Sequence, residues 1–423
     1  MMKKNSNFNI LNLTMLDFSA LLLIIAFFAI RDIPIFLYGT QAFFLINILL
    51  SKKDKKINIK FLLSWMVMIF WVVLSFLWAT STNNALKFLR EIGQCAIVCI
   101  LLSVYCKDKE SIKKMLKFIS IAMAIMIIYL FIKTPLSEWN KIYNYTDNVA
   151  DDAGRLGYTI GVHPNSMGSL CVITFCIWLY IFKTEKNKFS FIWMFLSVAL
   201  LLFSKSRGAI LQLLVMFFLF WILEENDFIK NIKKIILIVV ISVIAVYSIL
   251  NVPFLYNLIG FRFEGILGIF NSNSTKVDAS TTGRTKLMLV GLKMFLESPV
   301  LGVGAGNYAN IAYYEYDIWK EVYSHCNYIE ILANLGCVGF IIYYYPRIFC
   351  VLELLKKRKC LESDEKYEYV FLLSFCITNF FAEITKITYS NEPTQIIYTI
   401  SFGMLCYLLK RKKDSSRRDN NEK

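Results

Sequence analysis

Charged residues are scarce in this sequence. They make up 18% of the 423 residues, whereas a soluble globular domain carries about 25%. Hydrophobic residues make up 57%, and the mean hydropathy is +0.54. The few charges lie in short clusters between apolar runs of about 20 residues, which is the length that crosses the hydrocarbon core of a bilayer. The shortage of charge therefore argues against a soluble globule and predicts a multi-pass membrane protein.

Residues that would form a metal site or a disulfide framework are also missing. The eleven cysteines and two histidines form no CxxC pair and no Cys/His cluster, and no DxD motif is present. Most of the cysteines lie inside apolar runs, where they act as small hydrophobic residues. We therefore expect no metal and no cofactor.

Twelve apolar segments predict an all-α integral membrane protein with about twelve transmembrane helices. The segments lie near 13–30, 33–50, 60–79, 86–105, 113–132, 161–182, 189–204, 208–223, 232–250, 326–349, 367–386 and 393–409. We expect residues 1–423 to form one membrane domain, with no internal repeat.

Lysine and arginine are unevenly distributed, although the formal net charge is +15. With the N-terminus inside, the inner segments hold roughly two thirds of the cations; these segments are 1–12, 51–60, 106–117, 183–188, 224–234, 347–369 and 410–423. Short loops rich in cations stay in the cytoplasm, so both termini are predicted to be cytoplasmic. The same bias explains the net charge without a nucleic-acid partner.

Two long segments, 133–160 and 251–325, fall on the predicted outer side. Loops longer than about 15 residues are usually functional or disordered. The second contains GRTKLMLVGLKMFLES, whose Leu287, Val290 and Met294 recur at helical spacing and which Ser298-Pro299 ends. We expect short helices on the outer surface of the bundle. The following GVGAGN does not fit a dinucleotide loop, which needs a preceding strand, and predicts a tight turn or a close approach of the backbone to a ligand.

Arginine supplies a large share of the cations on the outer side, where six of the eleven lie: Arg31, Arg90, Arg155, Arg207, Arg262 and Arg284. A planar guanidinium suits phosphate better than the point charge of lysine. Arg207, with Lys205 beside it, is either functional or an interfacial arginine that reaches toward water. Arg284, with Lys286 nearby, has a solvated loop arginine as its alternative.

A polar stripe follows His325 into the tenth apolar segment. Asn327, Glu330 and Asn334 share one helical face, which predicts a water-filled or substrate-filled cavity with His325 at its mouth. The other histidine, His163 before Pro164, is better explained as a turn or cap residue. Glu383 and Lys386 are expected to pair with each other, and Arg90 with Glu91 is a candidate lining of the same cavity.

These motifs together resemble the O-antigen ligase and polymerase superfamily of bacterial membrane enzymes. The resemblance rests on the order SRGA, then SPVLGVGAGNY in a long outer loop, then SHCNYIEILANLG. It covers residues 155–345, which we expect to be the catalytic region. Cys326 and Asn334 depart from many relatives, which have Asn and Glu at those positions. The spacing after His325 is similar to that of capsule, exopolysaccharide and O-antigen polymerases.

The resemblance implies a GT-C-type fold and a metal-independent glycosyltransferase in the bacterial cytoplasmic membrane. Its donor would be an undecaprenyl-diphosphate-linked oligosaccharide, and its acceptor the next lipid-linked repeat unit. A chain-length regulator and a flippase of the same pathway are expected partners. The implied catalytic residues are His325, Arg284 and Arg207, and the implied substrate-binding or diphosphate-binding residues are Arg155, Arg90, Lys205, Lys286, Asn327 and Glu330.

Two other functions remain open from the sequence. A ligase would keep the chemistry and transfer the finished glycan to another acceptor. A transporter or flippase for the same lipid-linked sugar should show a cationic path through the middle of its spans, whereas here the arginines cluster at span ends. A lipid-binding structural protein would leave the His and Arg residues unexplained.

Overall fold

The computed structural model describes residues 13–52, 58–144, 154–225, 227–262, 279–358 and 361–421. Within these residues the chain is helical and contains no strand. The α-helices are α1 (Met15–Phe28), α2 (Pro34–Leu50), α3 (Ile59–Leu74), α4 (Thr82–Tyr105), α5 (Lys109–Lys133), α6 (Leu136–Asn144), α7 (Pro164–Glu185), α8 (Ser190–Phe203), α9 (Arg207–Glu224), α10 (Phe228–Asn251), α11 (Pro253–Leu255), α13 (Ala279–Glu297), α14 (Tyr308–Glu315), α15 (Asn327–Lys357), α16 (Lys366–Ala382) and α17 (Glu392–Asn421). Short 3₁₀ or π turns at Ser75–Leu77, Tyr158–Ile160 and Tyr256–Gly260 complete the described structure.

Each of the twelve predicted apolar segments falls on a helix. Seven helices of the described residues are long and apolar enough to cross a membrane: those at Ile59–Leu77, Thr82–Tyr105, Lys109–Lys133, Pro164–Glu185, Arg207–Glu224, Ile232–Asn251 and Asn327–Lys357. Three shorter apolar helices, α1, α2 and α8, accompany them. The chain is thus an all-helical, multi-pass membrane protein, and the full count of twelve crossings stays a prediction.

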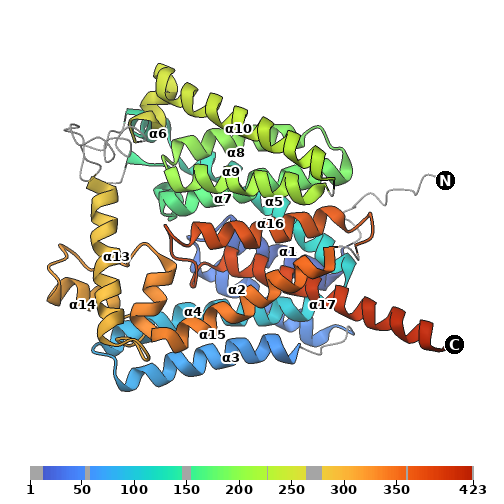
Figure 1. Ribbon diagram of the computed structural model, residues 1–423, viewed down its shortest axis with the longest axis horizontal. Helices are drawn as coiled ribbons and strands as arrows, with labels where there is room; N and C mark the ends of the chain where they lie inside the picture. Colours follow the sequence, from blue (N-terminus) through green and yellow to red (C-terminus); the bar gives the residue numbers. More distant parts are fainter. Residues whose placement is uncertain are drawn as a thin grey trace.

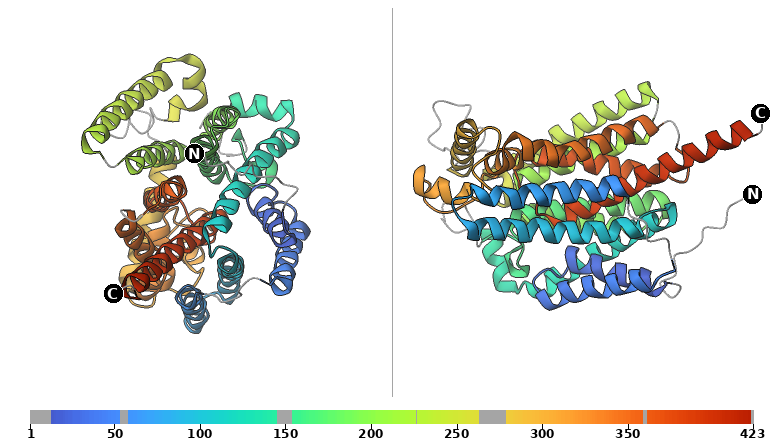
Figure 2. Two further views of the ribbon diagram at one scale, coloured as in Figure 1. Left: turned by 90° about the vertical axis from the view of Figure 1, so that its right-hand side faces the viewer. Right: turned by 90° about the horizontal axis from the view of Figure 1, so that it is seen from below.

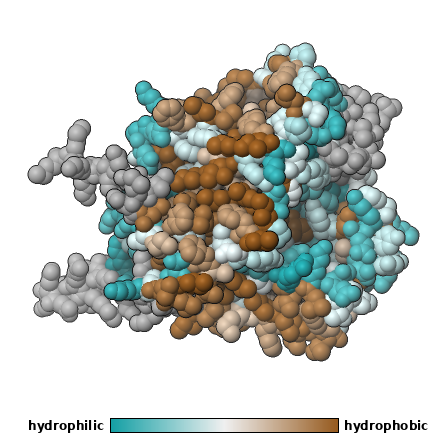
Figure 3. Space-filling view, turned by 180° about the vertical axis from the view of Figure 1, so that it is seen from behind, coloured by the Kyte–Doolittle hydropathy of each residue, from teal (hydrophilic) through white to brown (hydrophobic). Residues whose placement is uncertain are grey.

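The long helices run side by side, and α13 crosses their ends (Figure 1; Figure 2). On the face drawn in Figure 3, hydrophobic residues cover the middle of the bundle and hydrophilic residues gather at its two ends. This is the surface distribution of a membrane-spanning bundle, in which lipid contacts the apolar middle. We call the end that carries α13 and α14 the loop end, and the opposite end, where α17 finishes, the terminal end.

Polar contacts fix which helix ends meet at the terminal end. Asp17 at the start of α1 accepts hydrogen bonds from Tyr105 at the end of α4 (2.6 Å) and from Lys114 near the start of α5 (3.0 Å). At the loop end, Arg31 after α1 pairs with Glu392 at the start of α17 (2.6 Å). The ends of the chain that the structure describes, at α1 and α17, therefore lie on the same side of the bundle.

The segment between α10 and α15 contains helices, as expected. α13 ends at Glu297, directly before Ser298-Pro299, and buries Leu287, Val290 and Met294 in one cluster with α14. The prediction for this amphipathic helix is confirmed, although the helix begins a turn earlier than the quoted stretch. Residues 263–278 of the segment, like 145–153 of the other predicted outer loop, lie outside the described residues.

The glycine-rich turn packs against α15 by direct backbone contact. The amides of Val303 and Gly304 donate to the carbonyls of Ala333 and Asn334 at 2.8 and 3.0 Å. α15 has non-helical torsion angles at Gly336 (φ 65°, ψ −171°), a region that is essentially restricted to glycine. A Cβ on Gly336 would lie 2.1 Å from the carbonyl oxygen of Val300. The glycine-rich segment is thus a tight turn, one of the two expected alternatives, and the backbone that it approaches is that of α15; a close approach to a ligand stays a prediction.

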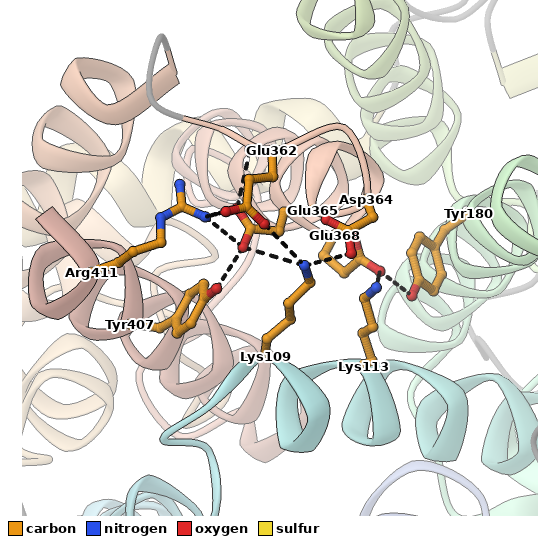
Figure 4. A network of polar contacts seen from close by, with 9 residues as sticks. All are labelled: Lys109, Lys113, Tyr180, Glu362, Asp364, Glu365, Glu368, Tyr407 and Arg411. Atoms are coloured by element: carbon orange, nitrogen blue, oxygen red, sulfur yellow. Dashed lines mark hydrogen bonds and ion pairs between the residues drawn. The ribbon is translucent and has the colours of Figure 1, made fainter. Parts of the chain in front are cut away.

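A cluster of ion pairs closes the terminal end between α5, α16 and α17 (Figure 4). Lys109 lies 2.6 Å from Asp364, and Arg411 lies 2.7 Å from Glu365, which also accepts from Tyr407 at 2.6 Å. Burial alone would raise the pKa of Glu365, but the hydrogen bonds from Tyr407 and Arg411 outweigh it, so the pKa lies below its usual value. The charged form of Glu365 therefore helps to hold the three helices together.

Replacing Gly336 by alanine should reduce stability by about 3 kcal/mol, because the backbone is strained for any other residue and the Cβ would meet a carbonyl oxygen. The measurement is thermal unfolding in detergent. Gly39→Ala in α2 is the matched control, since a Cβ there meets no atom within 4 Å. Equal unfolding temperatures for the two variants would show that the contact between the turn and α15 contributes nothing.

Glu365→Gln should remove part of the pH dependence of unfolding. A carboxylate with a lowered pKa stabilises the fold above its unfolded pKa, and this contribution disappears as the pH falls through the folded pKa. Wild type should therefore lose stability between about pH 5 and about pH 3, and the variant should lose less over that range. Glu110→Gln, which removes an exposed carboxylate from α5, should follow wild type. Identical acid transitions for wild type and Glu365→Gln would contradict the role of Glu365.

Candidate functional site

A cationic pocket opens at the loop end between α7, α9, α13 and the turn that joins α16 to α17. It holds roughly 400 Å³ of space, including the part that is open to solvent. Its lining contains four cations and no Asp or Glu among the described residues: Asn165, Ser169, Ser206, Arg207, Gly208, Ala209, Gln212, Arg262, Arg284, Ala382, Thr385 and Lys386. Such a lining favours an anionic ligand.

Arg207 is positioned by the start of α9. Ser206 is the N-cap of this helix, and its hydroxyl accepts from the amide of Ala209 at 3.4 Å. Arg207 is the first helical residue, and its guanidinium donates to the carbonyl of Arg262 (2.7 Å) and to the hydroxyl of Thr281 (3.3 Å). The free amides and the dipole of a helix N-terminus favour an anion at the same place.

Arg262 and Arg284 bring the segment after α10 to the pocket. Arg262 is buried and donates to the carbonyl of Lys205 at 2.6 Å, which ties this segment to the turn before α9. Arg284 is half-buried on the second turn of α13 and lines the same pocket. Arg207 and Arg284, 77 positions apart in the sequence, thus line the same pocket, and their catalytic roles stay predictions.

Arg155 lies behind the pocket rather than in its lining. It is buried, and it donates to the carbonyl of Ser204 (3.2 Å) and to the side chain of Asn165 (2.8 Å), which does line the pocket. His163 is the N-cap of α7, and its Nδ1 accepts from the amide of Asn165 at 3.2 Å. The cap prediction for His163 is confirmed, and the contacts of Arg155 favour a positioning role.

The remaining cationic candidates are not in the lining of this pocket. Lys205 is fully buried, and its ammonium lies 5.4 Å from the centre of the Phe261 ring. Lys286 is exposed and donates to the carbonyl of Asp317 at 3.2 Å. Arg90 is exposed on α4. Their roles in binding diphosphate stay predictions, and the pocket geometry does not support them.

The polar stripe on α15 faces protein rather than a cavity. Asn327, Glu330 and Asn334 are buried. Glu330 accepts from the amide of Ser324 at 2.7 Å, and Asn334 accepts from the amide of Tyr308 at 2.9 Å. The cavity interpretation was therefore wrong, because these side chains satisfy backbone groups of the loops that pack on α15. A direct contact of Asn327 or Glu330 with substrate stays a prediction.

His325 lies in the loop that this stripe holds in place. Its backbone has φ 61°, an unusual value for a residue other than glycine, and its ring centre lies 4.3 Å from that of Tyr323. His325 is not in the pocket lining, but Asn327, two residues later, donates from its amide to the carbonyl of Glu383 at 2.8 Å. The histidine loop and the turn that carries Lys386 are therefore joined directly.

Glu383 and Lys386 do not pair as expected. Glu383 is fully buried and accepts from Tyr344, Asn379 and Thr388, whereas the ammonium of Lys386 donates to Ser169 at 3.1 Å. The helix ends at Ala382, so the i, i+3 spacing that would align the two side chains no longer applies. The sequence interpretation therefore missed Lys386 as a pocket residue, and it counted Arg262 among the outer arginines without selecting it.

A group of three carboxylates, Glu362, Asp364 and Glu365, is close enough to hold a metal ion. This group lies at the start of α16, and the pocket lies at its end, so a helix of 17 residues separates them. That is a distance of about 25 Å. Lys109 and Arg411 already form ion pairs with these carboxylates, and their distance from the pocket leaves this group no part in its chemistry.

Glu330→Ala should both destabilise the protein and impair the site. It leaves the buried amide of Ser324 without its acceptor, which costs about 1–3 kcal/mol, and it releases the backbone next to His325. Thermal unfolding measures the first effect, and protease cleavage within residues 316–325 of the folded protein measures the second. Glu353→Ala, on the same helix but near the terminal end, is the control. Unchanged protection of the loop would contradict the role of Glu330.

Comparison with known proteins identifies the segment that supplies most of the lining of this pocket. Residues 167–344 match the family Wzy_C, described as O-antigen ligase. No curated protein matches the chain. The matched segment contains Arg207, Arg262, Arg284 and His325, whereas Lys386 lies outside it.

Proposed function

We propose, from the premise that residues 167–344 of this chain form an O-antigen ligase family domain, that the protein is a polysaccharide polymerase. It joins oligosaccharide repeat units that are linked to a polyprenyl diphosphate, such as undecaprenyl diphosphate. The growing glycan is the donor, and a hydroxyl of the next lipid-linked unit is the acceptor. The product is an O-antigen, capsular or exopolysaccharide chain.

The observation that carries this proposal is the pocket in which Arg207, Arg262 and Arg284 meet at one end of the bundle. Breaking the bond between the sugar and the diphosphate leaves negative charge on the phosphate oxygens. Guanidinium groups donate charge-assisted hydrogen bonds to such oxygens. A preorganised donor placed where charge develops typically contributes about 3 kcal/mol to the rate. The pocket has the charge and the donors that this leaving group requires.

His325 acts on the acceptor, as the base that takes the proton of its hydroxyl group. The acceptor hydroxyl attacks the anomeric carbon of the donor, the carbon–oxygen bond to the diphosphate breaks, and the diphosphate leaves with the electron pair. The hydroxyl proton goes to a base, and an imidazole is suited to this task near neutral pH. Asn327 and Glu330 act by holding the histidine loop against the turn between α16 and α17. The reaction needs no metal for this charge balance.

The membrane arrangement follows from the same proposal. The twelve apolar helices form a GT-C-type bundle in the bacterial cytoplasmic membrane, with both termini in the cytoplasm and the loop end on the outer face. The lipid-linked units reach the pocket from the outer leaflet, after a flippase has moved them there, and a chain-length regulator is a further partner. The position of the pocket at one end, rather than midway along the spans, argues against a transporter.

A ligase is the second candidate, because the matching family is described by that activity. It would use the same pocket and the same histidine. The difference lies in the acceptor, which would be another lipid or a protein instead of the next repeat unit.

Chain growth from purified undecaprenyl-diphosphate repeat units, in the presence of EDTA, tests the proposal. Wild type should form polymer. Arg284→Ala should lower the rate by roughly 100-fold, because one donor to the leaving group is lost. His325→Ala should lower it by about 100-fold or more, because the general base is lost. Lys293→Ala removes an exposed cation from the same helix as Arg284 and should leave the rate unchanged.

Three results would contradict parts of the proposal. Normal polymerisation by both site variants would show that these residues do not carry the reaction. Loss of wild-type activity on adding EDTA, restored by a divalent cation, would contradict metal independence. Transfer of a preformed chain to a different acceptor, without chain growth, would establish the ligase instead.

A further inference from the structure

We propose that Lys386 is a fourth cation of the pocket and positions the diphosphate of the donor by donating from its ammonium to a phosphate oxygen. The identity of this ligand rests on the proposed function. The placement of Lys386 rests on the geometry of the pocket, and Lys386 lies outside the segment that matches the family.

The position of Lys386 depends on residues far apart in the sequence. It belongs to the turn between α16 and α17, and its ammonium donates to Ser169 of α7, 217 positions away, at 3.1 Å. Ser169 in turn donates to Gln212 of α9 at 2.9 Å. Lys386 therefore contacts the wall formed by α7 and α9, while Arg284 comes from α13.

The described contacts leave Lys386 with unused donors. An ammonium group has three N–H bonds, and its one described hydrogen bond goes to a hydroxyl. The nearest carboxylate in sequence, Glu383, is occupied by Tyr344, Asn379 and Thr388. Lys386 is partly buried, and no carboxylate among the described residues accepts a hydrogen bond from it. Removing a cation from water without such a partner is costly, and an anion that enters the pocket would offset this cost while accepting the remaining N–H groups.

The surroundings of Lys386 also lower the pKa of its ammonium group. Burial lowers its pKa to about 8, although the charge of Glu383 acts in the opposite direction. The other charged groups that line the pocket around it are Arg207 from α9, Arg262 from the segment after α10, and Arg284 from α13. The residues of α7 that face it, Asn165 and Ser169, carry no charge. Because the ammonium form binds the anion, affinity should fall as the pH rises through this range.

Binding of undecaprenyl diphosphate, without a glycan, to the purified protein in lipid nanodiscs tests the inference independently of catalysis. Wild type should bind more weakly at about pH 9 than at about pH 7. Lys386→Gln should bind roughly 10-fold more weakly than wild type at the lower pH, because a charge-assisted hydrogen bond is lost, and should lose little more at the higher pH. Lys386→Arg should retain binding at both, because arginine stays charged.

Controls separate a positioning role from a structural one. Lys293→Ala, which removes an exposed lysine of α13, should show the affinity and the pH dependence of wild type. Thermal unfolding of each variant reports whether the bundle is intact. If both Lys386 variants lose binding at both pH values and unfold at lower temperature, the role of Lys386 is structural and the inference is wrong.

The remaining outcomes are also decisive. Wild-type affinity and pH dependence in Lys386→Gln would overturn the inference even if the protein polymerises repeat units. Conversely, binding that depends on Lys386 as described, in a protein that forms no polymer, would support this inference while the proposed function fails.

Discussion

The loop end of this protein depends on the hydrogen bonds of one buried residue, Asn327. Its amide donates to the carbonyl of Glu383, its side-chain oxygen accepts from the amides of Thr388 and Tyr389, and its side-chain nitrogen donates to Tyr344. Tyr344 in turn donates to Glu383. Because buried polar groups away from water must be paired, these hydrogen bonds fix the position of α15 relative to the turn after α16.

The hydrogen bonds of Asn327, which join α15 to the turn after α16, determine the geometry of the site. The start of α15 carries the histidine loop, and the turn after α16 carries Lys386, which reaches across to α7. The arginines of the pocket belong to other segments of the chain, which are α9, the segment after α10, and α13. The pocket is therefore assembled where separately positioned segments meet, so its shape depends on how the helices pack and not on any one of them.

The two ends of the bundle use charge differently. At the terminal end, Lys109 and Arg411 pair with carboxylates, and the result is a cluster of ion pairs that joins helices. At the loop end, the described contacts of Arg207 and Lys386 go to carbonyl and hydroxyl oxygens. The hydroxyl of Ser169 orients the ammonium of Lys386 without cancelling its charge, so that charge remains available to an anionic ligand.

The sequence by itself determined the features that depend on neighbours along the chain. The apolar runs indicated the helices, the spacing of Leu287, Val290 and Met294 indicated the buried face of α13, and Pro299 indicated its end. It also pointed to Arg207 and Arg284, because arginine supplies a large share of the cations on the predicted outer side and the family resemblance singles out these two. The packing of the helices brings Arg262 and Lys386 to the same pocket, places Asn334 and Glu330 against loop backbones, and gives Glu383 hydrogen bonds to residues other than Lys386. Those contacts depend on how helices that are distant in sequence pack together, and neither hydropathy nor local spacing contains that information.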